Sequence, residues 1–160
     1  EIFAIWKEVW GASRPRLRFV LSTQTAWDAP TQDLLSSGTV GADLLGITGY
    51  MSPASSIDYS WAAKTPEDVI AAFQGGIENK RAILRGQKAL AQAAGLGVVV
   101  YEGGVGLVEN GAIESGKATG FVTELLIATG RSPAFQSAVK AWLDMFREEL
   151  GDATKFGYFV

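Results

Sequence analysis

The run Gly97-Val98-Val99-Val100-Tyr101 is the feature that most constrains the fold of this chain. A short, continuous, β-branched run is typical of a strand that is buried on both faces, as in a parallel sheet. A long helical pattern precedes it, running from Thr65 to about Ala94. Thr65 can cap this helix and Pro66 suits its first turn. A long helix followed by a buried strand predicts parallel β/α units.

The other segments alternate in the same way. Helical patterns cover residues 1–11, 31–37, 65–94, 118–129 and 134–150, and strand patterns cover residues 16–23, 42–48, 97–101 and 156–160. This order predicts an α/β fold with a parallel sheet and right-handed crossovers. Two architectures fit: an open doubly wound sheet, or the C-terminal half of a TIM (β/α)8 barrel. A whole barrel takes roughly 250 residues, so we expect residues 1–160 to form a single, partial barrel domain.

The helical patterns lead to three further expectations. We expect a break or kink at Gly75-Gly76 within the long helix. The tryptophans on helix faces, Trp6, Trp10 and Trp142, are predicted to lie in the core. The first helix has an apolar face and begins without Met, so we expect the chain to be a piece of something longer.

Composition excludes several kinds of chemistry. The sequence has no histidine and no cysteine, which excludes Ser-His-Asp triads, thiolate zinc sites and disulfides. With 14 Lys plus Arg against 17 Asp plus Glu, we expect no nucleic-acid partner. No apolar run is long enough to span a membrane, and no signal peptide is visible. The Gly103-Gly104 loop fails the dinucleotide G-x-G-x-x-G pattern. We therefore expect no metal and no cofactor.

Ligands of parallel α/β proteins bind at the carboxyl ends of the strands. Glu102 follows the clearest strand, and burial there would perturb its pKa. It could instead cap the following helix or pair with a buried arginine. Tyr50 follows the second strand. Further candidates for substrate contact lie near these strand ends: Gln24, Trp27, Trp61, Tyr101 and Gly103. Indole faces stack on sugar rings, although a loop tryptophan more often anchors the loop to the core.

The segment Val98-Val99-Val100-Tyr101-Glu102-Gly103-Gly104 resembles the seventh strand of the clan A glycoside hydrolases, which are retaining (β/α)8 enzymes. Gly46-Ile47-Thr48-Gly49-Tyr50 resembles the sixth strand of that clan, Arg18 to Ala26 the fifth, and Phe156 to Val160 the start of the eighth. The chain is also similar to large bacterial extracellular proteins with this barrel, some of them polysaccharide-binding.

The resemblance implies a retaining glycosidase in which Glu102 is the nucleophile and Tyr50 supports it. It also implies a carbohydrate substrate and a secreted or periplasmic location. The clan's acid/base, a glutamate after an asparagine on the fourth strand, has no counterpart here, so this piece alone is expected to be inactive. Two alternatives remain: a catalytically degenerate carbohydrate-binding barrel, or a small-molecule-binding open α/β domain. Because a half barrel has unpaired strand edges, we expect a partner: the missing N-terminal half or a second chain.

Overall fold

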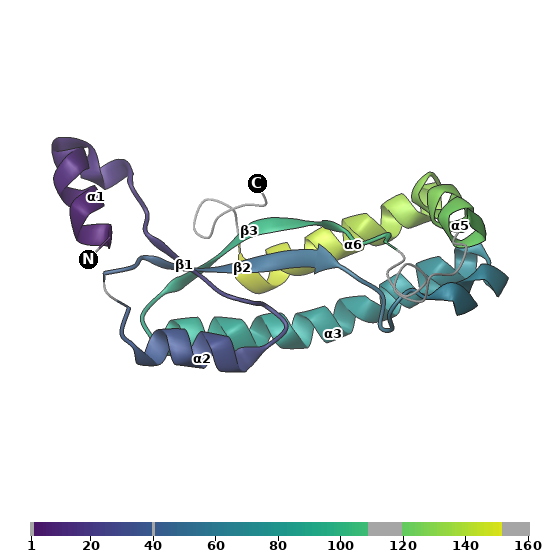
Figure 1. Ribbon diagram of the computed structural model, residues 1–160, viewed down its shortest axis with the longest axis horizontal. Helices are drawn as coiled ribbons and strands as arrows, with labels where there is room; N and C mark the ends of the chain where they lie inside the picture. The colour runs from purple at the N-terminus through teal and green to yellow at the C-terminus, as the bar shows by residue number, and fades with distance from the viewer. Residues whose placement is uncertain (1, 40, 109–119, 152–160) are drawn as a thin grey trace. The chain divides into compact units, whose positions relative to one another are not determined.

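The computed structural model describes residues 2–39, 41–108 and 120–151 of the chain. Its sheet is three-stranded and parallel, in the order β1-β2-β3 (Figure 1). The strands are β1 (Val20–Ser22), β2 (Leu44–Met51) and β3 (Gly97–Val105). Between β1 and β2, Val20 pairs with Leu44 and Ser22 with Gly46. The predicted α/β fold with a parallel sheet is therefore confirmed, while the predicted strand at Phe156–Val160 lies outside the described residues.

The helices occupy most of the predicted positions. Their bounds are α1 (Ile2–Trp10), η1 (Gly11–Arg16), α2 (Asp28–Ser36), η2 (Tyr59–Ala63), α3 (Pro66–Ala93), α5 (Gly120–Gly130) and α6 (Pro133–Leu150), where η marks a 3-10 helix. In the part of the chain that the structure describes, no helix has the length and apolarity needed to cross a membrane.

The fold groups into two compact units. The first unit comprises residues 1–49, 83–103 and 150–160, and the second comprises residues 50–82 and 104–149. The elements β2, α3 and β3 contribute to both units, as does α6 through its last residue.

Helix α3 begins at Pro66, as the sequence predicts, but it has no break at Gly75-Gly76. The predicted break is therefore absent, while the alternative of a kink stays a prediction. Gly76 serves packing instead. A Cβ atom built on Gly76 would collide with the carbonyl oxygen of Ser52. Glycine at this position therefore lets the helix approach a neighbouring backbone closely. The cost of a glycine inside a helix is about 1 kcal/mol relative to alanine, which a 28-residue helix tolerates.

In the first unit, strand β3 is buried on one face, whereas Leu45, Gly46 and Ile47 of the central strand β2 are all buried. Val98 and Val100 are buried, whereas Gly97 and Val99 beside them are half-buried and Tyr101 is exposed. Alternation with period two indicates a strand that packs one face against the core. The prediction that this strand is buried on both faces was therefore wrong. The buried apolar residues of this unit are Phe19, Leu45, Ile47, Leu84, Ala91, Leu96, Val98, Val100 and Leu150.

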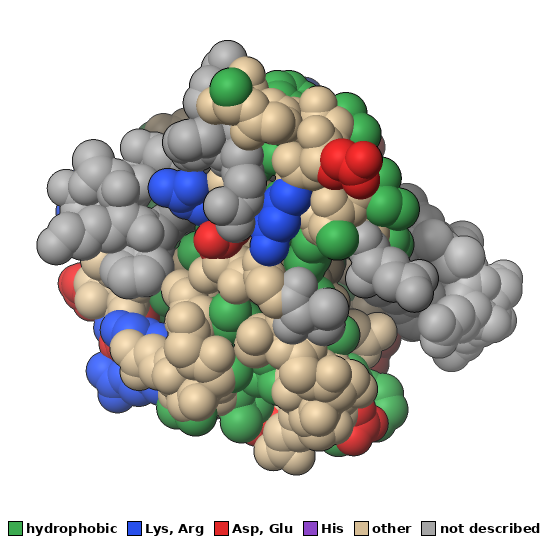
Figure 2. Space-filling view, turned by 90° about the vertical axis from the view of Figure 1, so that its left-hand side faces the viewer, with side chains coloured by type: hydrophobic (Ala, Val, Ile, Leu, Met, Phe, Trp, Pro, Cys, Tyr) green, Lys and Arg blue, Asp and Glu red, His purple; other side chains and the backbone are tan. Residues whose placement is uncertain are grey.

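Helix α1 also belongs to the first unit, and none of its residues is buried. Phe3 stacks on Phe19 with ring centroids 4.7 Å apart, and Lys7 Nζ lies 5.3 Å from the same ring. Trp6 and Trp10 are 49% and 40% exposed, so the prediction that they lie in the core was wrong. The helix contacts Phe19 through Phe3 and Lys7, whereas its apolar face, formed by Ile2, Ile5, Trp6 and Val9, is exposed. On the face of the molecule that Figure 2 shows, basic and acidic side chains are interspersed, with hydrophobic ones between them.

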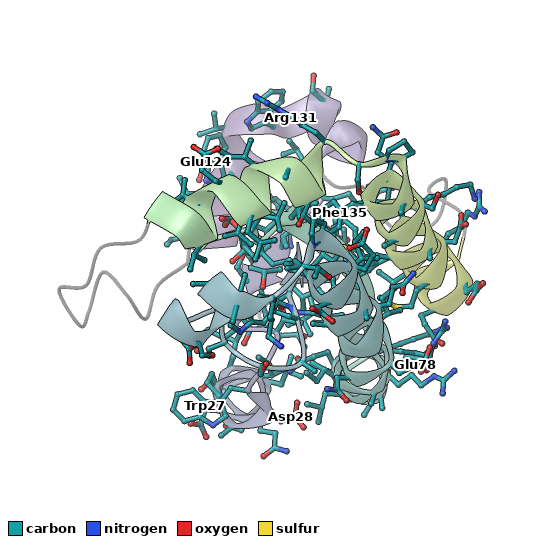
Figure 3. The ribbon with its side chains drawn as sticks, turned by 90° about the vertical axis from the view of Figure 1, so that its right-hand side faces the viewer. Trp27, Asp28, Glu78, Glu124, Arg131 and Phe135 are labelled. Carbon is teal, nitrogen blue, oxygen red and sulfur yellow. The ribbon has the colours of Figure 1, made fainter. Side chains whose placement is uncertain are left out.

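The core of the second unit is rich in aromatic residues. Phe73 of α3 meets Phe135 of α6 edge to face, with ring centroids 5.4 Å apart, and Trp142 meets Phe146 in the same way. Figure 3 shows Phe135 in the interior, while Glu124 and Arg131 lie toward the outside. Trp142 is 3% exposed, which confirms its predicted place in the core. Edge-to-face pairs of this kind stabilise a core beyond the area that they bury.

Candidate functional site

The loop that follows β1 is fastened to β2 by hydrogen bonds. The Thr23 N–H donates to the Gly46 carbonyl oxygen at 2.9 Å, which extends the strand ladder by one residue. Two residues later, the Thr25 hydroxyl donates to the Thr48 carbonyl oxygen at 2.7 Å and accepts from the Thr48 N–H at 2.5 Å. The Thr25 side chain takes the place of the next pair of backbone hydrogen bonds between β1 and β2, so residues 23–25 have little freedom to move away from the sheet.

The side-chain amide of Gln87 fastens the same loop to α3. Its Nε2 donates to the Thr25 carbonyl oxygen at 3.2 Å and to Asp28 Oδ1 at 3.0 Å. Its Oε1 accepts from the Thr31 hydroxyl at 2.8 Å. Gln87 and Thr31 are fully buried, at 0% exposure. Both amide hydrogens and the amide oxygen thus have partners, which is the condition under which a buried polar network stabilises a structure.

Trp27 lies between the two residues that Gln87 holds. It occupies the N-cap position of α2 with extended dihedral angles, φ −139° and ψ 113°. Its side chain is 62% exposed, and Figure 3 shows the indole at the surface beside Asp28. The exposed indole offers a flat, apolar face at the carboxyl end of a parallel strand.

Glu102 lies inside β3 rather than after it, because the strand continues to Val105. Its side chain is exposed. In a regular strand Glu102 shares a face with Val98 and Val100, while Tyr101 shares the opposite face with Val99. The glycines that follow Glu102 continue the strand in extended conformation, where the sequence predicted a loop.

The remaining predicted site residues divide between the two units. In the first unit Gln24 and Tyr101 are exposed and Gly103 is half-buried. The Tyr101 ring lies over β2, since a Cβ atom built on Gly46 would be 3.2 Å from Tyr101 Cδ1. Tyr101 therefore lies on the same sheet to which the loop that carries Trp27 is hydrogen-bonded.

Tyr50 and Trp61 belong to the second unit. Tyr50 is 40% exposed, and its predicted support of Glu102 stays a prediction. Trp61 is 3% exposed, and Lys64 Nζ lies 5.5 Å from its ring. Its indole packs in the core of the second unit, as loop-anchoring tryptophans do, so Trp61 has no free face for a sugar.

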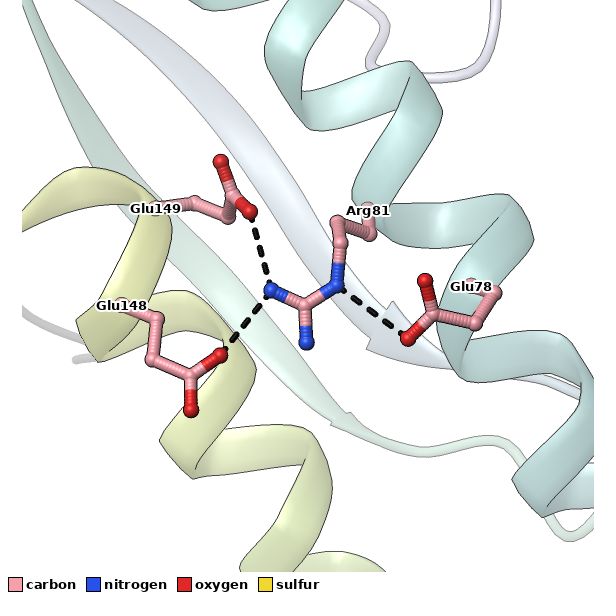
Figure 4. A network of polar contacts seen from close by, with 4 residues as sticks. All are labelled: Glu78, Arg81, Glu148 and Glu149. Atoms are coloured by element: carbon pink, nitrogen blue, oxygen red, sulfur yellow. Dashed lines mark hydrogen bonds and ion pairs between the residues drawn. The ribbon is translucent and has the colours of Figure 1, made fainter.

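Arg81 forms the densest charged cluster among the described residues, and it lies in the second unit (Figure 4). Its Nη1 bonds to Glu149 at 2.9 Å and Glu148 at 3.0 Å on α6, and its Nε bonds to Glu78 at 3.2 Å on α3. The hydrogen bond to Glu149, followed by that to Glu148, raises the pKa of Arg81 further above its usual value. The guanidinium joins two helices through these bonds, and we assign it a structural role.

A small hollow beside β3 and the acidic side chains of the described residues offer less to a ligand. A small hollow lined by Lys88, Gln92, Leu96, Gly97, Val98 and Leu150 lies at the amino end of β3, which is the end of a parallel sheet opposite to the usual ligand site. Among residues 2–39, 41–108 and 120–151, no group of three or more acidic side chains has a metal-binding arrangement.

Among the residues that shape the Trp27 loop, Gln87 was not singled out by the sequence. Gln87 offered a signal, because it occupies an apolar position of the helical pattern, three residues after Leu84 and four before Ala91. A polar residue at a buried helix position needs a polar partner nearby. The partners, Thr25 and Thr31, are 56 or more residues away in the chain, so no local pattern could identify them.

The chain matches no protein-family model, no curated protein sequence and no solved structure.

Proposed function

We propose that this chain binds polysaccharide, as the C-terminal half of a glycoside-hydrolase-like (β/α)8 barrel, and that Trp27 is its sugar-stacking residue. The observation that carries the proposal is the 62% exposed indole of Trp27 on a loop that hydrogen bonds hold on both sides. The three parallel strands and their helices are compatible with such a half barrel.

The chemistry of the loop suits a sugar ring. An indole offers a flat, apolar face to the C–H face of a pyranose. The exposed amide of Gln24, three residues before Trp27, can donate to and accept from sugar hydroxyls. Tyr101, which is 39% exposed, adds a second aromatic side chain with a hydroxyl group.

Cleavage with Glu102 as the nucleophile is the second candidate. The exposure of Glu102 on β3 favours it, because the carboxylate can be reached by a substrate. A retaining mechanism also needs a carboxylic acid about 5–5.5 Å from the nucleophile. Binding needs only the side chains of Trp27, Gln24 and Tyr101. The alternation of side chains along β3 also sets Glu102 on the face of the strand opposite to Tyr101. Binding is therefore the function that we favour.

Affinity electrophoresis in gels containing hydroxyethyl cellulose, xylan or galactomannan tests the proposal. Wild-type protein should be retarded by at least one of these polymers. We expect Trp27→Ala to weaken binding at least about tenfold, the equivalent of about 1.4 kcal/mol, and Trp27→Phe to weaken it less. Trp6→Ala is the matched control, since Trp6 is 49% exposed on α1, and it should bind as wild type does.

Retardation of Trp27→Ala equal to that of wild type, or no retardation of wild type by any polymer, would contradict the proposal. Release of reducing ends by wild type but not by Glu102→Gln would establish the second candidate instead.

A further inference from the structure

We propose that Gln87 is a positioning residue for Trp27, and that it fixes the indole in its sugar-binding orientation before any ligand arrives. This inference rests on the proposed function of Trp27. Gln87 does not reach the surface, because it is fully buried. It would act on the sugar only through the loop that it holds.

The contacts of Gln87 lie on both sides of Trp27 in the chain. Nε2 holds the carbonyl oxygen of Thr25, two residues before the tryptophan, at 3.2 Å. The same nitrogen holds Asp28 Oδ1, one residue after it, at 3.0 Å. One amide group thus closes the segment from residue 25 to residue 28 onto α3, and the backbone of Trp27 is fixed between two anchors.

The third contact of Gln87 has a different target. Oε1 accepts from the hydroxyl of Thr31, which lies within α2 and also contacts the Thr23 hydroxyl at 2.9 Å. Loss of this bond would leave both Nε2 bonds in place. The two ends of one side chain can therefore be tested separately: the amide nitrogen bonds to Thr25 and Asp28 on either side of Trp27, and the amide oxygen bonds to Thr31 further along α2.

A fixed indole binds more tightly than a mobile one. An immobile side chain pays no ordering entropy when the ligand arrives, and preorganisation raises affinity by removing that cost. Without the Nε2 bonds, the segment around Trp27 would sample other conformations, in which the indole turns away from the ligand. We expect affinity to fall by about fivefold to tenfold, which is the usual cost of ordering one such side chain.

Gln87→Met and Thr31→Val form the decisive pair of variants. Met keeps the length of the side chain but removes all three bonds of the amide, including both Nε2 bonds to the residues around Trp27. Val keeps the volume of Thr31 and removes its bond to Oε1. Both variants lose buried hydrogen bonds and should lower the free energy of unfolding. A merely stabilising Gln87 would make the two variants alike in binding, whereas a positioning Gln87 makes them differ.

The measurement combines binding with 19F NMR of protein labelled with 5-fluorotryptophan, where Trp27→Phe assigns the Trp27 signal. In the ligand-free protein, we expect Gln87→Met to shift or broaden the Trp27 signal and Thr31→Val to leave it unchanged. On the polymer that retards wild type, we expect only Gln87→Met to weaken binding. An unchanged Trp27 signal in Gln87→Met, or equal binding losses in the two variants, would overturn the proposal.

Asp28 supplies a second pair in case Gln87→Met does not fold. Asp28→Ala removes the acceptor of one Nε2 bond, while Asp28→Asn keeps an oxygen at the same place, and both remove the charge. We expect the Trp27 signal to change in Asp28→Ala and to be restored in Asp28→Asn; the same signal in both would count against the inference.

The two proposals can fail separately. If Trp27→Ala binds as wild type does, the proposed function fails, and the ligand-free spectra still decide whether Gln87 fixes Trp27. If Trp27→Ala loses binding while Gln87→Met keeps both its signal and its affinity, only the positioning role fails.

Discussion

Beside β1, the interior of the first unit holds the hydroxyl and amide groups of Thr25, Thr31 and Gln87, whereas the interior of the second unit is apolar and rich in aromatic rings. Thr129, a buried polar residue of the second unit, bonds to the Leu125 carbonyl oxygen of its own helix at 2.8 Å. Polar groups with partners on other segments fix those segments in direction, because hydrogen bonds are directional. Apolar packing stabilises without such direction. The difference suggests that the buried polar groups of the first unit hold a loop in a defined position, whereas the apolar core of the second unit mainly stabilises the fold.

The tryptophans of the two units show the same contrast. Trp27 and Trp61 both lie in segments that follow a strand, and the sequence predicts the same sugar contact for both. Trp27 is 62% exposed and Trp61 is 3% exposed. A tryptophan after a strand can therefore serve as a ligand surface or as an anchor, depending on which other segments cover it.

The largest expected effect tests this contrast in stability. Trp61→Ala should lower the free energy of unfolding by about 3–5 kcal/mol, because it leaves a cavity in the core of the second unit. Trp27→Ala should change it by less than about 0.5 kcal/mol, as surface substitutions do. Urea unfolding followed by circular dichroism measures both. Similar losses in the two variants would show that Trp27 is also an anchor.

A smaller effect compares the charged cluster of the second unit with the buried polar groups of the first unit in how their contribution to Tm depends on salt. Arg81→Met keeps the apolar stem but removes the bonds to Glu149, Glu148 and Glu78. We expect a lower Tm than wild type at about 0.02 M NaCl and a smaller difference at about 0.5 M, because salt screens partly exposed charges.

Thr31→Val is the control for salt, since its lost hydrogen bonds are buried and uncharged. Its Tm difference from wild type should be the same at both salt concentrations. A salt-independent difference for Arg81→Met would mean that packing of the side chain, and not its charge, joins α3 to α6.

The smallest effect compares the starts of two helices. Thr65 N–H and the Thr65 hydroxyl donate to Asp68 Oδ2 at 2.9 and 3.2 Å at the start of α3. Helix α2 has Trp27 at its N-cap position and no side-chain cap hydrogen bond. The bond from the Thr65 backbone N–H, more than any other contact, lowers the pKa of Asp68 below its usual value of 3.8. The lowered pKa means that the folded protein favours the charged carboxylate.

The contribution of Asp68 is therefore fully present above pH 3.8 and is lost as the pH falls toward the folded-state pKa. Asp68→Asn should be less stable than wild type at pH 6, and the difference should shrink in acid. Thermal unfolding of both proteins between about pH 6 and pH 3 measures it. A difference that persists unchanged at the lowest pH would show that the introduced amide destabilises the helix start for a reason other than charge.

The elements that could be predicted from the sequence are those whose signals are local. The start of α3 follows from Thr65 and Pro66, and the buried position of Trp142 follows from the amphipathic pattern of α6. The strand around Val98–Val100 was found, but its extension past Glu102 was not, because glycine is depleted in strands and a Gly-Gly pair indicates a loop. The residues proposed to bind sugar were partly found, since Trp27 was named from its place after a strand.

The sequence by itself determined the alternation of helices and strands, and with it the parallel α/β fold, because hydrogen bonding and amphipathicity act over a few neighbouring residues. Tertiary structure alone decided that Trp27 is exposed and Trp61 buried, that the apolar face of α1 faces outward, and that Gln87 reaches the loop after β1. Exposure and long-range hydrogen bonds depend on which distant segment lies opposite, and that is a property of the folded chain rather than of any short pattern within it.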